Sequence, residues 1–278
     1  MSRISYVNGR YLPHKMSMVH IEDRGYQFGD GVYEVILVLN KKLVDFDSHY
    51  SRLKRSLDQI SLDYHFSQIL IKQIIDRLIR FNLISNGLIY LQVTRGVAER
   101  AHQFPDDVSA ALVVTAKPIS INPVIEGKKA ITTTDQRWDR RDIKTIQLLP
   151  NCIAKQQAVE NDAFEAIMVM NDGTITEGAS SNLWMVNKEN QLITRKASNI
   201  ILNGITKVTI AELAEIQKIQ VIERAFTVNE AKGAKELFIT SATAIVTPIT
   251  QLDEHMIADG NVGPVSLALR NMYLKKAL

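Results

Sequence analysis

The chain has 278 residues, 46% of them hydrophobic, and a formal net charge of +3 from 33 basic and 30 acidic side chains. Such a length can bury a sizeable core in one large or two modest domains, and the nearly balanced, dispersed charge argues against a nucleic-acid partner. No apolar stretch is long enough to span a bilayer, and the N-terminal "MSRISYVNGR" lacks the apolar core of a signal peptide, so we expect a soluble cytoplasmic protein with no membrane partner.

The cysteine and histidine content argues against disulfides and metal sites. Cys152 is the single cysteine, which excludes an intramolecular disulfide, and we expect it to be a small buried hydrophobic residue. The histidines show no spacing that would gather metal ligands, so we expect no structural or catalytic metal.

The first part of the chain predicts strands followed by helices. We expect a hairpin around Asn8-Gly9, a strand at 31–39, a turn at 40–42 and a short strand at 43–46. Next we expect a helix capped by Asp47 or Ser48 and then a second helix from Phe66 to Leu83. The first helix has an apolar stripe and a polar stripe. The apolar stripe consists of Tyr50, Leu53, Leu57 and Ile60, and the polar stripe consists of His49, Arg52 and Ser56.

Strands predicted at 88–96 and 110–116 flank an irregular loop, and the two prolines of "KPISINP" mark a linker at 117–123. We therefore expect a smaller N-terminal domain at 1–120 and a larger C-terminal domain at 121–278. The second part mixes short strands at 165–170 and 236–240 with helices after Asn151 and Gly204, and has hairpin turns at 171–173 and 188–190. The fold class predicted is α+β with two domains.

Three segments of the second part suggest one cofactor. Lys144 in "RRDIKTIQLLPN" and Glu177 in "TITEGASSNLW" are the two residue types that pyridoxal phosphate needs, an amine for a Schiff base and an acid facing the pyridine nitrogen. A Gly204-Ile205-Thr206 turn opens a predicted helix, whose free backbone amides and threonine hydroxyl would make an anion site for the phosphate. Taken singly, each segment is also compatible with an ordinary surface lysine, turn or first helical turn.

The ordered set of motifs resembles the fold-type IV pyridoxal-phosphate enzymes over nearly the whole chain. The shared motifs are "EDRGYQFGDGVYEV" from Glu22, "HYSRL" from His49, "VTRGVAERAHQFP" from Val93, the two segments around Lys144 and Glu177, "LNGIT" from Leu202 and "TSATAIVTP" from Thr240. The resemblance implies a two-domain fold with pyridoxal 5'-phosphate in the cleft between domains and Lys144 as the catalytic Schiff-base residue. It also implies that Arg52 binds the phosphate, and that the turn at Ser241-Ala242 contributes, although Ala242 replaces a threonine hydroxyl found in some members.

Within that family the resemblance is greatest to D-amino-acid transaminases. In that subgroup an Arg-x-His pair, here Arg100 and His102, reaches into the neighbouring subunit and binds the substrate carboxylate together with a tyrosine, here Tyr33. His49 matches a further histidine of the subgroup. The resemblance therefore implies a homodimer with shared sites that exchanges an amino group between D-alanine and 2-oxoglutarate, giving pyruvate and D-glutamate.

Two other members of the family remain open as alternatives. 4-Amino-4-deoxychorismate lyase uses the same cofactor and lysine to release pyruvate and 4-aminobenzoate. Branched-chain L-amino-acid aminotransferase ranks third, because its apolar pocket requires no Arg-x-His pair. A cofactor-free binding module is disfavoured, because Lys144, Glu177, Arg52 and Tyr33 are all present.

Overall fold

A computed structural model describes residues 3–122 and 125–277, and the chain divides into two compact units. The N-terminal unit runs to Ile121 and also includes Ile143–Gln147, while the C-terminal unit comprises Asn122–Asp142 and Leu148–Ala277. The predicted linker spans this division, and its Pro123 lies outside the described residues. The predicted α+β fold class is confirmed, and each unit has its own β-sheet.

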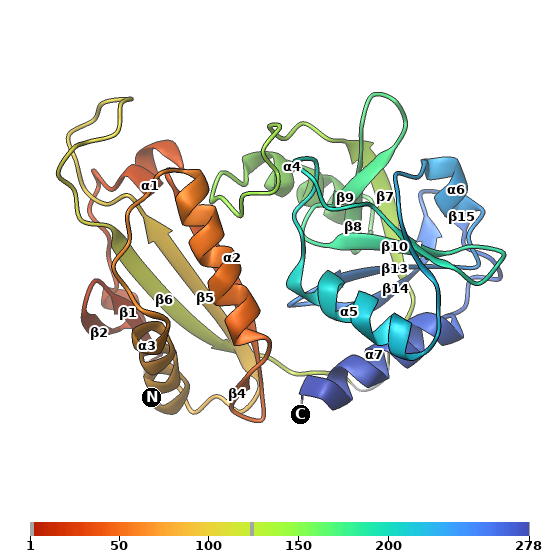
Figure 1. Cartoon of the computed structure of the whole chain (residues 1–278), viewed down its shortest axis with the longest axis horizontal. Helices are drawn as coiled ribbons and strands as arrows, with labels where there is room; N and C mark the ends of the chain where they lie inside the picture. Colours follow the sequence, from red (N-terminus) through yellow and green to blue (C-terminus); the bar gives the residue numbers. More distant parts are fainter. Residues whose placement is uncertain (1–2, 123–124, 278) are drawn as a thin grey trace. The chain divides into compact units, whose positions relative to one another are not determined.

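The N-terminal unit is a six-stranded antiparallel sheet with the order β2-β1-β6-β5-β3-β4 (Figure 1). The strands are β1 (Ile4–Val7), β2 (Arg10–Pro13), β3 (Gly31–Leu39), β4 (Lys42–Leu43), β5 (Gly87–Thr94) and β6 (Ala111–Pro118). A 3-10 turn, His14–Met16, and a short helix α1 (Arg24–Phe28) precede β3. Helices α2 (Phe46–Gln59) and α3 (Gln68–Phe81) share one apolar core with the sheet, so a single layer of helix covers it.

Two tight turns set the register of this sheet. Asn8 and Gly9 have φ of 42° and 89°, the left-handed conformation that a two-residue hairpin turn requires, and the predicted hairpin is confirmed. Asn40 and Lys41 form a second such turn, with φ of 46° and 66°. The short strand that follows is Lys42–Leu43, not 43–46, because helix α2 already begins at Phe46.

Helix α2 buries residues of both of its predicted stripes. Its N-cap is Asp45, so the expected caps two and three residues further on lie inside the helix. Leu53 and Leu57 are buried in the core, as the apolar stripe predicts, and His49 and Ser56 of the polar stripe are buried as well. The polar stripe of α2 therefore contacts other polar groups of the protein, since His49 and Arg52 bind Glu34 and Ser56 accepts from the Lys144 N–H.

The C-terminal unit is built on a nine-stranded mixed sheet with the order β12-β11-β10-β13-β14-β7-β8-β9, and β15 pairs with β14 (Figure 1). The strands are β7 (Lys128–Thr134), β8 (Glu165–Val169), β9 (Ile175–Gly178), β10 (Asn182–Val186), β11 (Leu192–Thr194), β12 (Val221–Glu223), β13 (Glu236–Ser241), β14 (Ile245–Leu252) and β15 (His255–Met256). Both predicted hairpin turns, between β8 and β9 and between β10 and β11, are confirmed.

Four helices pack on this second sheet: α4 (Leu149–Glu160), α5 (Ile205–Ile216), α6 (Val228–Lys232) and α7 (Pro264–Ala277). Helix α5 begins directly after Gly204, as predicted. Helix α4 begins two residues before Asn151, with Pro150 in its first turn, where a missing N–H removes no helical bond. Cys152 is exposed rather than buried, because α4 buries the face that carries Ala154 and Ala158.

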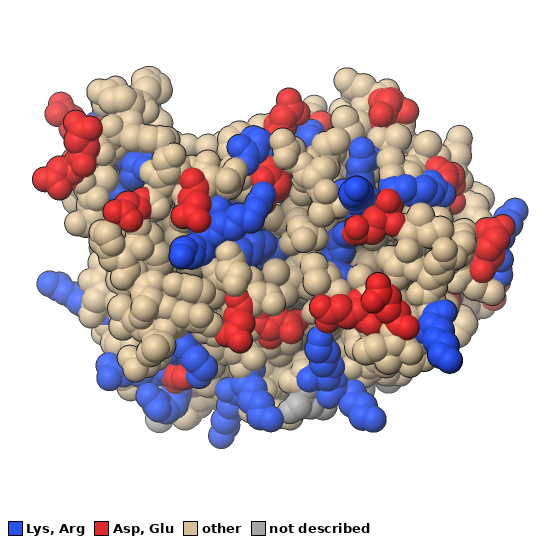
Figure 2. Space-filling view, viewed as in Figure 1, with Lys and Arg blue, Asp and Glu red and all other residues tan. Residues whose placement is uncertain are grey.

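The surface carries both signs of charge. Lysine and arginine side chains lie among aspartate and glutamate side chains over the face seen in Figure 2, in keeping with the net charge of +3. In the described part of the chain, no helix is both long enough and apolar enough to cross a membrane.

Candidate active site

The segment that carries Lys144 packs against the start of strand β3 in the N-terminal unit, although the residues before and after it belong to the other unit. Tyr33 donates its backbone N–H to the Lys144 carbonyl at 3.0 Å, and Thr145 forms an isolated antiparallel bridge with Val32. The backbone N–H of Ile146 donates to the Gly31 carbonyl at 3.1 Å. The lysine backbone is thus fixed as if it were one more strand at the edge of β3.

The side chain of Lys144 lies on an aromatic ring. Its Nζ is 4.2 Å from the centroid of the Tyr33 ring, and Tyr33 stacks on Tyr90 at 5.6 Å between centroids. An ammonium group over a tyrosine face gains roughly 0.5–2 kcal/mol, which orders the side chain without forming an ion pair. The structure therefore brings together two of the predicted site residues, Lys144 and Tyr33.

Glu34, the residue next to Tyr33, joins two other predicted site residues. Its carboxylate is 1% exposed and accepts two hydrogen bonds from Arg52, at 2.8 and 2.7 Å, and its Oε2 lies 2.7 Å from His49 Nδ1. Burial raises the pKa of Glu34, but the charge and hydrogen bonds of Arg52, together with those of His49, outweigh it and lower the pKa to about 2. Arg52 and His49 are thus held rigidly on an ionised carboxylate.

The sequence analysis did not identify Glu34 as a residue of the site. It lies in the motif "GVYEV", where it alternates with Tyr33 along β3, and an acid on the buried side of a strand requires a cationic partner. That requirement, combined with the arginine of "HYSRL", is the signal that could have found it.

The predicted Arg100 and His102 lie on an exposed loop of the same unit, and both contact Phe28. The Arg100 guanidinium carbon is 4.6 Å from the centroid of that ring, and the His102 ring centroid is 5.7 Å away. The two side chains are therefore brought together on one aromatic ring, and both remain accessible to solvent.

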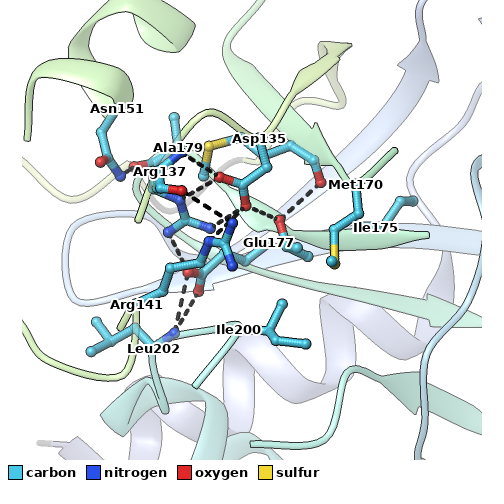
Figure 3. A network of polar contacts seen from close by, with 12 residues as sticks. Asp135, Arg137, Arg141, Asn151, Met170, Ile175, Glu177, Ala179, Ile200 and Leu202 are labelled. Atoms are coloured by element: carbon cyan, nitrogen blue, oxygen red, sulfur yellow. Dashed lines mark hydrogen bonds and ion pairs between the residues drawn. The ribbon is translucent and has the colours of Figure 1, made fainter. Parts of the chain in front are cut away.

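The second predicted acid, Glu177, lies on β9 of the C-terminal unit at the centre of a polar network (Figure 3). It is 4% exposed. Its oxygens accept from Arg137 Nη1 at 2.6 Å, from Asn182 Nδ2 at 2.9 Å and from the Leu202 N–H at 3.2 Å. Burial raises the pKa of this carboxyl, and the charge of Arg137 opposes the rise only in part.

Asp135 holds Arg137 from the other side. The Nε and Nη2 atoms of Arg137 donate to the two oxygens of Asp135 at 3.0 and 2.8 Å, and Thr176 donates its hydroxyl to the same carboxylate at 2.7 Å. Arg141 Nε lies 3.3 Å from Asp135. Burial raises the pKa of Asp135, but its hydrogen bonds and the Arg137 charge lower it overall. Arg137 is therefore clamped between two buried carboxylates.

These arginines were also missed, because "DQRWDRRD" has the composition of a solvated charged stretch. Arg137 is nevertheless buried, with 9% of its side chain exposed, and Arg141 has 6% exposed. The nearest signal in the sequence is the proximity of this charged run to Lys144.

The third predicted element, the start of helix α5, adjoins the Glu177 network. Gly204 is its N-cap and makes no side-chain cap bond, so the first amides of the helix depend on other acceptors. A Cβ on Gly204 would clash with Asn182 Oδ1, and Asn182 Nδ2 donates both to Glu177 and, at 2.9 Å, to the Leu202 carbonyl. One asparagine thereby links the buried acid to the helix N-terminus, while Thr206 is buried and Ile205 half-buried in the first turn.

The turn at Ser241-Ala242 begins where strand β13 ends, in the same unit. Ser241 Oγ lies 3.1 Å from Thr243 Oγ1 and accepts from the Ala244 N–H at 3.0 Å. Ala242 itself contributes no side-chain donor, so two hydroxyls beside it and the backbone amides are the groups that can bind an anion there.

Each unit has groups of the kind that pyridoxal phosphate requires. A buried carboxylate held by an arginine, an amide and a backbone N–H can face a protonated pyridine nitrogen, and a helix N-terminus with a glycine cap can bind a phosphate. In the N-terminal unit, a half-buried lysine ordered on a tyrosine ring is an amine of the kind that the aldehyde of this cofactor requires. In the described residues, no group of three or more His, Cys, Asp or Glu side chains could hold a metal ion.

Comparison with known proteins agrees with this chemistry. The family model described as Amino-transferase class IV matches residues 31–252. A D-alanine aminotransferase of Bacillus licheniformis is 43% identical over 276 residues, covering 97% of this chain and 96% of the relative. One from Listeria innocua is 41% identical over 275 residues, covering 97% and 94%.

Solved structures share the fold at lower identity. A branched-chain amino acid aminotransferase of Thermobaculum terrenum, solved in its PLP form, has a TM-score of 0.89 at 24% identity and covers 99% of this chain and 94% of its own. The Escherichia coli branched-chain amino acid aminotransferase has a TM-score of 0.91 at 21% identity, covering 100% and 95%.

Proposed function

The chain belongs to the class IV aminotransferases and is a pyridoxal phosphate-dependent D-amino-acid transaminase, and from that premise we propose that it exchanges an amino group between D-alanine and 2-oxoglutarate. The observation that carries the choice of substrate is 40–43% identity to D-alanine aminotransferases over nearly the entire chain. The products would be pyruvate and D-glutamate. A cytoplasmic location stays a prediction.

We propose that the following residues hold the cofactor. Lys144 would bind its aldehyde carbon, Glu177 its pyridine nitrogen, and Arg52, Ser241 and the Gly204-Ile205-Thr206 turn its phosphate; the Ala242 backbone would take part where a hydroxyl is missing. When bound, pyridoxal phosphate supplies an aldehyde that condenses with amines and a ring that accepts electrons from the substrate.

The chain's own side chains then have separate tasks. Lys144 Nζ, released when a substrate amine takes its place, would remove the proton from the substrate α-carbon and return it to the cofactor carbon. Glu177 would keep a proton on the ring nitrogen, since its carboxylate is positioned by Arg137 and Asn182. Burial raises the pKa of Glu177, so an adjacent cationic ring would be a favourable partner for its ionised form.

Substrate recognition would rest on the N-terminal unit. A carboxylate is best bound by an arginine with a second donor close by, and Arg100 and His102 both lie against the Phe28 ring as accessible donors. The Tyr33 hydroxyl would be the third donor, and His49 would act from its fixed place on Glu34. This arrangement recognises the α-carboxylate that both amino acid and keto acid share.

We propose that the enzyme acts as a homodimer in which the loop of Arg100 and His102 serves the neighbouring subunit. Support comes from a run of exposed apolar side chains before and in α1, an unusual feature for a surface that stays in water. Met16, Met18, Ile21 and Tyr26 are 65%, 77%, 75% and 77% exposed. Analytical ultracentrifugation would test this, since a monomer at assay concentration would contradict it.

The first experiment loads the protein with pyridoxal phosphate and follows its absorption after adding D-alanine, L-alanine or neither, without a keto acid. We expect conversion to the pyridoxamine form with D-alanine alone. Conversion with L-alanine alone would refute the stereochemistry. No conversion with either enantiomer would favour the lyase reaction, to be tested with 4-amino-4-deoxychorismate.

A pair of lysine variants tests the assigned role. Lys144→Ala should lose turnover while keeping its fold, whereas Lys188→Ala, which alters an exposed lysine in the turn between β10 and β11, should retain it. Turnover by the Lys144 variant would contradict the assignment.

A further inference from the structure

Arg24 is a buried arginine whose side chain the proposed chemistry does not use. It is 3% exposed, and its three guanidinium nitrogens have three different partners. Nε donates to Asp30 at 2.8 Å, Nη1 to the Ala101 carbonyl at 2.7 Å and Nη2 to the His102 carbonyl at 3.5 Å. A buried guanidinium that holds two carbonyls of a distant exposed loop fixes the path of that loop.

The two carbonyls lie in the segment that carries the predicted carboxylate-binding side chains. Arg100 and His102 flank Ala101, whose carbonyl binds Arg24, and both contact the Phe28 ring. The Arg24 guanidinium carbon is itself 4.7 Å from the centroid of that ring. Arg24 and Phe28, at the two ends of helix α1, therefore set the spacing between Arg100 and His102.

A second buried arginine, Arg95, shares the Asp30 carboxylate with Arg24. Arg95 Nε donates to the same oxygen of Asp30 at 2.8 Å, and its other nitrogens donate to the carbonyls of Ile60 and Ser61, at the end of α2. The Arg95 guanidinium carbon also lies 3.6 Å from the ring centroid of Phe104, further along the loop. Asp30 thus joins two buried cations, each of which holds a different part of the loop.

The base of the loop is equally constrained. Gly96 has φ of +100°, and its carbonyl accepts the backbone N–H of Arg24 at 2.9 Å. Asp23 and Val97 form an isolated antiparallel bridge, so the loop leaves β5 in contact with the segment before α1. Its direction is therefore fixed at the base, and the Arg24 side chain fixes it again at Ala101.

We propose that Arg24, backed by Asp30 and Arg95, is a positioning residue for substrate recognition. It touches no substrate and acts by holding the Ala101 and His102 carbonyls, so that Arg100 and His102 meet an α-carboxylate with preset geometry. This rests on the proposed function, which assigns carboxylate binding to that pair. Positioning a binding group affects ground state and transition state alike, so its loss should raise KM and leave kcat nearly unchanged.

The test compares Arg24→Gln with Arg80→Gln, which removes an exposed arginine from the end of α3 in the same unit. In the Arg24 variant we expect KM for both D-alanine and 2-oxoglutarate to rise by about tenfold, the value of one charge-assisted hydrogen bond, with kcat within about twofold. The Arg80 variant should match the wild type. Unchanged KM values, or a fall in kcat alone, would overturn the proposal.

A second readout follows the loop itself. Limited digestion with trypsin, analysed by mass spectrometry, measures cleavage after Arg100 in the folded holoenzyme. Cleavage there should be faster in Arg24→Gln than in the wild type or Arg80→Gln, and equal rates would overturn the clamp. If the wild type lacked D-amino-acid transaminase activity, the proposed function would fail, while the digestion would still decide whether Arg24 orders the loop.

A conservative variant covers the case in which Arg24→Gln does not fold. Arg24→Lys keeps the positive charge beside Asp30. A lysine ammonium group, however, is not a planar fork and cannot bind the three partners of the arginine guanidinium at once. We expect its KM values and its cleavage rate to lie between those of the wild type and the glutamine variant. A lysine variant identical to the wild type in both readouts would show that the fork of hydrogen bonds is not needed.

Discussion

Replacing Arg137 by glutamine tests the polar network around Glu177 most directly. The substitution removes the cation between two carboxylates, of which Asp135 has 0% and Glu177 5% of its side chain exposed. Loss of one partner of a buried ion pair destabilises a protein by about 3–5 kcal/mol. Glu177 would retain its amide donors, and Asp135 would retain its hydrogen bond from Thr176. We therefore expect the free energy of unfolding to fall by about 3 kcal/mol, the lower end of that range.

The loss of stability in the Arg137 variant should also depend on pH. In the wild type, the lowered pKa of Asp135 contributes stability that is present above its ordinary value of 3.8 and lost as pH falls. The raised pKa of Glu177 has the opposite sign, because its contribution is present at low pH and lost as pH rises through the folded pKa. Without Arg137 the pKa of both carboxyls should rise, so the variant should lose more stability at about pH 8 than at about pH 5.

Urea unfolding followed by tryptophan fluorescence is a suitable assay. The chain has two tryptophans, Trp138 and Trp184, and both lie in the C-terminal unit, so the signal reports that unit alone. Arg140→Gln is the matched control, since Arg140 pairs with Asp142 in the same segment but is 37% exposed. An Arg137 variant no less stable than this control, or a loss that shrinks as pH rises, would refute the reasoning.

Three further outcomes follow from the structure. Glu34→Gln should destabilise the N-terminal unit by about 3–5 kcal/mol near neutral pH. The difference from the wild type should vanish as pH falls from the ordinary pKa of Glu34, 4.5, towards its lowered pKa of about 2. Near-UV circular dichroism of tyrosine would measure the unfolding, and equal stability at neutral pH would contradict the prediction. Gly204→Ala should weaken pyridoxal phosphate binding about tenfold in equilibrium dialysis by displacing Asn182, whereas Gly233→Ala, with no neighbour nearer than 3.6 Å, should not. Cys152 should react fully with a thiol reagent in the native protein, and protection until unfolding would show that its exposed position is wrong.

The sequence predicted the features that depend on neighbouring residues. The Asn8-Gly9 turn, the strand at 31–39 and the helix after Gly204 all follow from local preferences for turns, alternation and capping. Lys144 and Glu177 could be chosen from residue type and surrounding motif, because the cofactor's chemistry specifies an amine and an acid. The short strand 43–46 and the buried Cys152 were wrong because element ends and the buried face of a helix depend on packing.

Tertiary structure alone decided how the charges are paired. Arg137 meets Glu177 across 40 residues of sequence and Arg24 meets Ala101 across 77, and no local pattern encodes either contact. Charged side chains can be buried only where partners from distant segments converge, so the same arginine is a surface residue by composition and a buried positioning group in the fold. The sequence by itself determined which chemical groups this protein has, and long-range packing determined which of them are fixed in place.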